Sequence, residues 1–400
     1  MFTSPLVRRL SRLPAPARGP SLAALGVAAG LGLAGTPARA DRFTAALAAE
    51  TWDDDERPLH GLALLAYDLD DLPHGARLGF EYNTDTLRVG YLGHRLSDRV
   101  AFGAQLTGEA FVAGLTTDHF LDGQSELDRS FRSSYVLGQT GLKLQVGERT
   151  WFEVEAGLRR WFFGELPDET SAALVLPVDS WSFEPRLRWT WWQLADDAAW
   201  RDRHRLFPRL RGVAVGAELG ADVRDEVRAF GARDPEAFDP PDTRNQPEPF
   251  ALRARQWALA GWQAHPGFRL QLSESAGANV GVDDVTRTRV GGLGPYVVPV
   301  AGMPWAHNWT EHHLAGALSA HVRVAEGIEA GPLATVVAIV DPHRDGDTDE
   351  VGVPWGVGAM VDARFGGWQV DLRGGWSPSY AEDTGKAAYS VWLGGGWVSN

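Results

Sequence analysis

Long segments of this chain alternate apolar residues with polar or charged ones. Between residues 151 and 162, one set of alternate positions is apolar and the other carries most of the charge, and the same period recurs over 100–112, 181–192 and 213–224. Because successive side chains of a strand point to opposite faces, each segment predicts a strand with one apolar and one polar face. Segments of about ten residues or more are long for soluble strands but suit tilted strands that cross a membrane.

Short turns and long polar connections alternate between these segments. Short turns fall at 97–99, 147–149, 265–267, 326–327 and 365–367. Long polar segments lie between them, at 113–131, 165–178, 225–249, 284–310, 341–350 and 379–387. An up-and-down membrane barrel has this arrangement, with short turns at its periplasmic end and long loops outside. The tight turn at 83–85 and the long connection at 195–208 are two exceptions.

The strand count favours an all-β transmembrane barrel of antiparallel strands over residues 58–400. Fifteen candidate strands lie near 60–68, 76–83, 86–97, 99–112, 132–147, 150–164, 178–194, 208–224, 250–264, 268–283, 311–325, 329–341, 351–364, 367–378 and 388–399. Bacterial barrels have an even number of strands, so we predict sixteen, with the missing strand near the N-terminus, and fourteen is the alternative. Residues 41–57 read as a short periplasmic segment, helical around Phe43–Leu47. A soluble β-sandwich, β-helix or propeller is the competing architecture, but the chain has no repeat of fixed period.

The first forty residues predict a signal peptide. They contain five arginines and no acidic residue, followed by an apolar run at 21–35 and the small-residue pattern Ala38-Arg39-Ala40. The run is short and rich in glycine for a membrane anchor, so we expect residues 1–40 to be cleaved after export. After Asp41 no apolar stretch is long enough for a transmembrane helix. The absence of cysteine fits an oxidising compartment and excludes disulfides and thiol catalysis.

Composition narrows the class of partner. The 17 tryptophans and 46 glycines favour a β-rich chain with aromatic residues near membrane interfaces. The formal net charge of −14, which becomes more negative when the signal peptide is removed, argues against binding to nucleic acid. We therefore expect a protein of the bacterial outer membrane, with the membrane lipids and the barrel assembly machinery as its partners.

The polar faces of the predicted strands place charged residues inside the barrel. They could line a pore and set its ion or solute selectivity, or pair across strands and hold a plugged lumen rigid. Acidic and basic residues occur in similar number, which favours pairing. The candidates for lining the lumen are Glu109, Glu153, Glu155, Arg159, Glu184, Arg186, Arg188, Glu218, Arg224, Arg253 and Arg255.

Three stretches resemble parts of one known family. Residues 64–70 (LLAYDLD) are similar to the first barrel strand of members that lack long periplasmic domains, and 222–225 with 243–245 resemble a strand end and outer loop. The most specific stretch is 289–296 (RVGGLGPY), continuing to 301–305 (AGMPW). It resembles the large loop that folds back into the lumen five strands before the C-terminus. The family is the bacterial surface antigen family, the barrel of outer-membrane assembly and translocation proteins.

The resemblance implies a barrel with the 284–310 loop folded inward. Its inward-loop candidates are Arg289, Gly291, Gly292, Tyr296, Gly302, Pro304 and Trp305. The family's arginine-containing tip is absent, because Ala301-Gly302-Met303 stands in its place. No POTRA-like modules fit in the residues before the predicted barrel, so a protein-assembly role would need a separate periplasmic partner. The last strand, with Trp392, Gly394 and Trp397, resembles an assembly signal.

The remaining motifs do not indicate enzyme or cofactor chemistry. The acidic segment 341–350 lacks the glutamate that an EF-hand needs at its twelfth position, and His312-His313 lacks the spacing of a zinc motif. Ser275 sits in a strand pattern without the glycine of a nucleophile elbow. We therefore expect no cofactor, no metal and no catalytic residue. The function that fits best is a porin-like channel or envelope protein; an assembly or translocation factor, a secreted soluble binding protein and an outer-membrane hydrolase are the alternatives.

Overall fold

The computed structural model shows a barrel formed by residues from 41 onward. It describes residues 41–52, 59–83, 86–109, 116–117, 120–121, 124–125, 127–166, 170–194, 211–238, 244–283, 285–293, 298–303, 308–342, 349–366, 368–385 and 389–398. The predicted signal peptide at 1–40 and the connection at 195–208 lie outside the described residues. In the described part of the chain, no helix is both long and apolar enough to cross a membrane.

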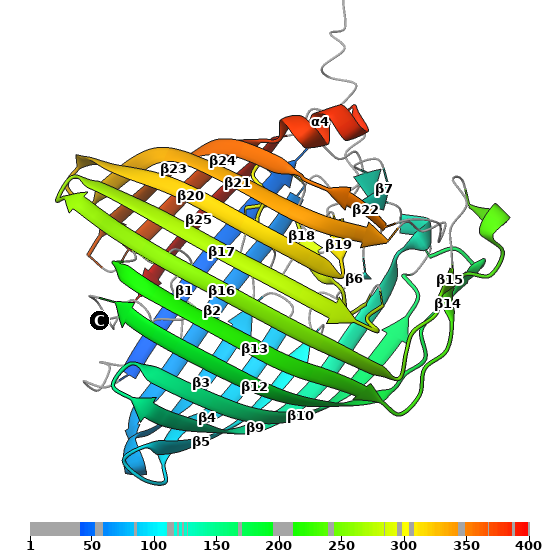
Figure 1. Ribbon diagram of the computed structural model, residues 1–400, viewed down its shortest axis with the longest axis horizontal. Helices are drawn as coiled ribbons and strands as arrows, with labels where there is room; N and C mark the ends of the chain where they lie inside the picture. Colours follow the sequence, from blue (N-terminus) through cyan, green and yellow to red (C-terminus); the bar gives the residue numbers. More distant parts are fainter. Residues whose placement is uncertain are drawn as a thin grey trace, which may run out of the picture. The chain divides into compact units, whose positions relative to one another are not determined.

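Sixteen antiparallel strands form a closed barrel, as predicted (Figure 1). In order around the wall they are β1 (Asp41–Trp52), β2 (Leu59–Leu72), β3 (Ala76–Asn83), β4 (Thr86–Arg95), β5 (Val100–Glu109), β9 (Phe131–Gly147), β10 (Thr150–Gly164), β12 (Trp181–Leu194), β13 (Gly212–Arg224), β16 (Phe250–His265), β17 (Phe268–Val280), β20 (His312–Ala325), β21 (Ile328–Pro342), β23 (Trp355–Phe365), β24 (Trp368–Trp376) and β25 (Tyr389–Val398). Each pairs with its neighbour along the chain, so the topology is up and down.

Shorter elements lie in the connections. They are the strands β6 (Thr116–Thr117), β7 (Phe120–Leu121), β8 (Gln124–Ser125), β11 (Leu174–Val175), β14 (Phe230–Ala232), β15 (Arg244–Asn245), β18 (Thr288–Val290), β19 (Asn308–Thr310) and β22 (Asp349–Gly352), the helix α4 (Pro378–Thr384), and the 3-10 turns η1 (Pro73–Gly75), η2 (Leu127–Arg129) and η3 (Pro235–Ala237). Apart from η1, all of them belong to the long connections, at the end of the barrel that we call the loop rim. The opposite end, with the short turns, is the turn rim.

The sixteenth strand is β1, and the predicted periplasmic segment is wrong for residues 41–52. These residues pair with β2 on one side and with β25 on the other, from Thr44–Val398 to Trp52–Ser390. They are extended rather than helical, because the edges of both neighbouring strands need hydrogen-bond partners to close the wall. As a consequence residues 64–70, which resemble a first barrel strand, lie in the second strand β2.

The two faces of the wall differ in chemistry as the alternation predicts. Large apolar side chains point outward, and examples are Leu158, Leu219 and Leu372, each close to half exposed. The charged residues of the same strands point into the lumen. Trp181 is on the outer face with 44% of its surface exposed, whereas Trp151 and Trp192 stack inside with ring centroids 3.8 Å apart. The tryptophans therefore serve both the membrane face and the lumen.

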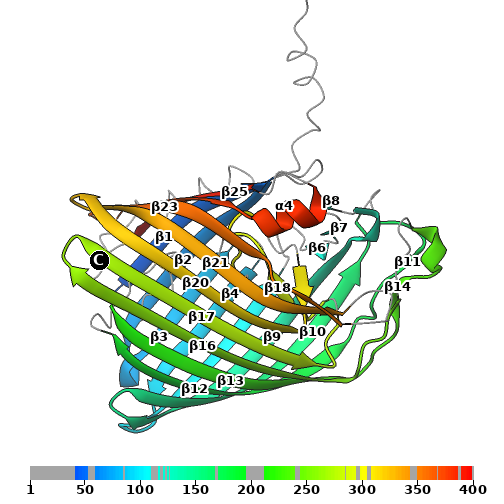
Figure 2. The ribbon, with the colours of Figure 1, turned by 45° about the horizontal axis from the view of Figure 1, so that its top comes forward.

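The loop rim contains folded structure of its own. The strands β11, β14 and β15 form a small sheet over a cluster that includes Phe131, Phe230 and Phe238. In Figure 1 this sheet extends beyond the ends of the barrel strands at the right. The connection between β17 and β20 goes the other way: Figure 2 shows its strand β18 inside the barrel wall.

Replacing Leu47 with lysine tests whether β1 belongs to the membrane wall. Leu47 is outward, 48% exposed and central in β1. We expect Leu47→Lys to lower the free energy of unfolding in lipid vesicles by about 2–4 kcal/mol, as a lysine at the membrane midplane does. Leu96→Lys, at the turn rim, should cost about 1 kcal/mol or less. Unfolding by urea, followed by tryptophan fluorescence, measures both losses. Small losses of equal size would mean that residues 41–52 do not lie in the membrane wall.

Candidate functional site in the barrel lumen

The inner face carries every charged residue predicted to line the lumen. Glu109 lies on β5, and the others lie on four consecutive strands: Glu153, Glu155 and Arg159 on β10, Glu184, Arg186 and Arg188 on β12, Glu218 and Arg224 on β13, and Arg253 and Arg255 on β16. The registers bring opposite charges together across these strands, because Glu153 lies opposite Arg188 and Glu218 lies opposite both Arg188 and Arg255. We call this surface the charged wall.

The most buried part of the charged wall centres on Glu184. Its side chain is 2% exposed, and its carboxylate contacts Arg159 Nε at 2.8 Å and Arg186 Nη2 at 2.9 Å. The Arg159 guanidinium also lies 4.3 Å from the ring centre of Tyr135 and 4.7 Å from that of Trp161. A carboxylate removed from water requires this level of pairing, so Glu184 holds β10 and β12 together rather than facing a solvent path.

A second group is more open to solvent. Arg188 donates to Glu218 at 2.7 Å and to Glu153 at 3.3 Å, and these three side chains keep between 22% and 28% of their surface exposed. Arg255 is still more exposed. Among the described residues, neither Arg255 nor Glu155 has an ion-pair partner within 4 Å. The middle of the charged wall therefore presents both signs of charge to the lumen.

A third group joins the wall to the base of the inward loop. Arg224 Nη1 lies 2.6 Å from Asp283 Oδ2, and Arg224 and Arg253 both contact Asp222. Asp283 in turn accepts hydrogen bonds from the backbone amide and hydroxyl of Thr286, which fixes the turn where the loop enters the lumen. Asp222 lies in the 222–225 stretch that resembles a strand end, but neither it nor Asp283 was among the predicted lumen-lining residues.

The loop after β17 folds into the lumen as the resemblance implies. Its strands β18 and β19 pair with each other, and Val290 and Val300 pack with Val337 and Ile339 of β21 in a buried cluster. Tyr380 of α4 completes this cluster. The loop therefore has its own apolar core against one side of the barrel, continuous with the helix at the loop rim.

The tip of the loop lies against the inner wall by backbone contact. The amide of Ala301 donates to Thr335 Oγ1 at 2.8 Å, and the amide of Gly302 donates to Ser390 Oγ at 3.1 Å. Gly302 has φ +87°, and a Cβ there would meet the backbone of Trp376 and Ser377. Backbone amides of small residues at the tip and hydroxyl groups on the wall thus hold the tip in place.

Glu50 of β1 joins the inward loop to the wall from a buried position. Its side chain is fully buried, and Oε1 accepts a hydrogen bond of 2.7 Å from the amide of Leu293. Leu293 and Ala301 pack with Leu333 and Trp392 in a second buried cluster. The loop therefore contacts β1, β21 and β25, which include the two strands that close the barrel. Glu50 was not predicted as an inner residue, because residues 41–57 were expected to lie outside the barrel.

Of the predicted inward-loop residues, Gly291, Gly292 and Gly302 are buried in this arrangement, and Arg289 is partly buried in β18. The other three, Tyr296, Pro304 and Trp305, lie outside the described residues. The same holds for most of the acidic segment at 341–350.

A second polar cluster on the inner face was not predicted. Arg269 of β17 lies 2.5 Å from Glu329 of β21, beside His321 of β20. Both charged side chains are almost fully buried. This cluster ties three neighbouring strands together near the turn rim.

The serine and histidine motifs lie in β17 and β20, and the described residues do not bring them together as a reactive pair. Ser275 makes no hydrogen bond to a histidine in the described part of the chain, and His312 accepts from the amide of Asn279 while His313 lies over Gly277. Among the described residues, no three potential metal ligands come together.

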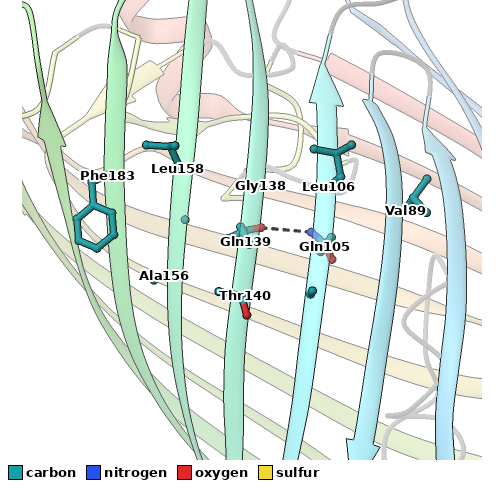
Figure 3. A pocket seen from close by; sticks show the side chains of 11 residues that line it. Val89, Gln105, Leu106, Gly138, Gln139, Thr140, Ala156, Leu158 and Phe183 are labelled. Carbon is teal, nitrogen blue, oxygen red and sulfur yellow. Dashed lines mark hydrogen bonds between the residues drawn. The ribbon is translucent and has the colours of Figure 1, made fainter. Parts of the chain in front are cut away.

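A hollow lies on the outer face of the barrel, and two of its strands, β10 and β12, carry the charged wall on their inner face. It has a volume of about 520 Å³ and is lined mainly by outward-facing residues of β4, β5, β9, β10 and β12. Figure 3 shows Gly138 and Thr140 between the larger side chains of Leu106, Leu158 and Phe183. Small residues between large ones make a shallow depression in the membrane face. Three residues of the inner face, Gln105, Gln139 and Gly157, also line it.

Neutralising one buried and one partly exposed carboxylate of the charged wall should lower the free energy of unfolding by different amounts. Glu184→Gln leaves Arg159 buried without its counter-charge, so we expect the free energy of unfolding to fall by about 3–5 kcal/mol. Glu153→Gln changes a partly exposed pair and should cost about 1 kcal/mol or less. Urea unfolding in vesicles measures both. Losses of equal size would contradict the division of the wall.

Comparisons with known proteins support the fold. No protein-family model matches the chain, and no curated protein matches it. Among solved structures, BamA from Haemophilus ducreyi lacking POTRA domains 1–3 is 8% identical with a TM-score of 0.59, and the match covers 89% of this chain and 70% of that one.

CdiB from Escherichia coli is 12% identical with a TM-score of 0.55, over 91% of this chain and 64% of that one. CdiB from Acinetobacter baumannii is 7% identical with a TM-score of 0.53, over 90% and 60%. The chain thus spans less than two thirds of either CdiB chain. With sixteen strands and an inward loop before the last five of them, the chain has the barrel fold of these BamA and CdiB structures, as its sequence resemblance indicated.

Proposed function

We propose that this protein is a channel of the bacterial outer membrane for small ions and polar solutes, with the inward loop setting its closed state. The observation that carries the proposal is the division of the lumen. The loop packs against β1, β21 and β25, while the charged wall lies on β10, β12, β13 and β16. The partly exposed charges of that wall are the natural lining of a water path.

Transport would be passive and governed by the lumen charges. Arg188, Glu153 and Glu218 are paired yet exposed enough to exchange contacts with a passing ion. Arg255 and Glu155 add one positive and one negative group in the same region. Rings or clusters of charge select ions in this way in other pores. Mixed signs support weak selectivity rather than a strict preference for anions or cations.

The anchors of the loop would determine how often the channel opens. Thr335 and Ser390 accept hydrogen bonds from the tip, and Asp283 attaches its base to Arg224. A loop held by a few hydrogen bonds and two small apolar clusters can leave its position without unfolding the barrel, because the wall is closed by its own backbone pairs.

Weakening the tip should increase conductance. We expect the double variant Thr335→Val with Ser390→Ala, which removes both acceptors, to raise the open probability about tenfold in planar bilayers, as about 1.4 kcal/mol of lost loop stabilisation would. Deleting 291–307 should leave the pore open. The control is Thr140→Val on the outer face. A channel proposal fails if wild type and the deletion variant conduct equally little.

A second function is supported by the fold. BamA and CdiB are outer-membrane assembly and translocation proteins, and this barrel resembles theirs, so the chain could act on client proteins with a separate periplasmic partner. In that case the seam between β1 and β25 would have to open for strands to pass, because a closed wall offers no edge for pairing. The channel needs no such opening.

A disulfide across the seam separates the two functions. Ala48 faces Gly394, and a Cβ on Gly394 would lie 3.5 Å from the Cβ of Ala48, within reach of a disulfide. We expect the Ala48→Cys with Gly394→Cys variant to conduct like wild type in both oxidised and reduced form. Loss of an envelope phenotype on oxidation alone, with conductance unchanged, would favour the assembly role. The reduced protein is its own control.

A further inference from the structure

One acidic side chain faces the membrane in the middle of the wall. Glu274 has the same parity on β17 as Leu272 and Val280, which are 51% and 62% exposed on the outer face. The register with both neighbouring strands is unbroken from Leu270 to Ala278, so no bulge turns Glu274 inward. Among outward-facing strand positions whose side chains the structure describes, Glu274 is the only acidic one.

Its depth makes the position unusual. Glu274 is the central residue of β17, with six residues to each end. At about 3.3 Å per residue and a tilt of about 40°, each end lies roughly 15 Å away along the membrane normal. The carboxylate is therefore near the midplane, where a long side chain would be needed to reach water and glutamate is too short.

The side chain of Glu274 is partly exposed on this face. Its direct neighbours across the sheet are Ala258 on β16 and Gly316 on β20. A Cβ on Gly316 would meet only Val336 Cγ1 at 3.9 Å, so the surface beside Glu274 is open. Gln256 donates one hydrogen bond of 3.2 Å from Nε2 to Glu274 Oε1, and it also points outward.

Polar groups in hydrocarbon need partners, and this pair satisfies only part of its own capacity. A carboxylate can accept about four hydrogen bonds and an amide nitrogen can donate two, so Glu274 and Gln256 each keep sites open. Small residues around them (Ala254, Ala258, Ala276 and Gly316) allow another wall to approach closely. An intramembrane ionisable residue in such a setting indicates a contact surface.

We propose that the Glu274–Gln256 surface is where a second copy of this chain docks in the membrane. Two copies inserted in the same direction are related by a two-fold axis along the membrane normal, which keeps every residue at its own depth. In this dimer Gln256 of each copy would lie beside Glu274 of the other, because the two residues are hydrogen-bonded neighbours on the outer face of one copy. The second N–H of each amide then donates to the opposite carboxyl group, so the surface is complementary to itself in hydrogen bonding.

Single cysteines test the contact, because the chain has none of its own. Ala276→Cys lies opposite Gln256 on the outer face, and Ala359→Cys on the outer face of β23 is the matched control. Each full-length variant is reconstituted at low density in phosphatidylethanolamine–phosphatidylglycerol vesicles and oxidised with copper-phenanthroline. We expect Ala276→Cys to give a dimer of doubled mass, and Ala359→Cys to stay monomeric.

Changes at Glu274 then show whether the polar pair makes the contact. Adding Glu274→Ala to Ala276→Cys should reduce the dimer to the level of the Ala359→Cys control, whereas Glu274→Gln, which still hydrogen-bonds to an amide, should retain it. Heat-dependent gel mobility confirms that each variant is a folded barrel. A monomeric Ala276→Cys, which lipid or a different protein at this surface would produce, overturns the proposal, as does a dimer that Glu274→Ala leaves unchanged. Conductance plays no part in the readout, so this result stands apart from the channel proposal.

Discussion

In a membrane core every strand needs a hydrogen-bonded neighbour on both sides, because no water is present to satisfy an open edge. The first and last strands meet this requirement by pairing with each other, from Thr44–Val398 to Trp52–Ser390, and this ladder closes the sheet into a barrel. Closure decides which parity of each strand faces lipid and which faces the lumen. It also brings Glu50, Trp392 and Ser390 to the inner face of the seam, where the inward loop rests on them.

The lumen that closure creates has two unlike halves. One half is filled by a loop with its own apolar core, so burial of Val290, Val300 and Met303 stabilises its position. The other half carries charges whose burial decreases from Glu184 to Arg188 and Arg255. Buried pairs join neighbouring strands, whereas the partly exposed pairs face the lumen and would line the proposed channel. On one inner surface, some charges therefore stabilise the wall and others would line the proposed channel.

Alternation made most of the wall predictable, because lipid demands apolar residues at every second position of a strand. It failed at β1, where the run of alanines between Ala45 and Ala49 has little contrast between its faces. That error hid Glu50 and with it the anchor of the loop. The tip could not be derived from residue types either, since its contacts are backbone amides meeting Thr335 and Ser390. Glu274 was visible in the sequence, but its meaning depended on an unbroken register that only the structure provides.

The central claim is that the loop lies against the inner wall when the barrel is in a membrane, and hydrogen exchange of its amides measures this most directly. The amides of Leu293, Ala301 and Gly302 donate to side chains of the wall. In vesicles, peptides from 285–293 and 298–303 should exchange as slowly as those of β21, because both need a structural opening before exchange. Exchange as fast as that of the exposed segment 246–250 would contradict the account.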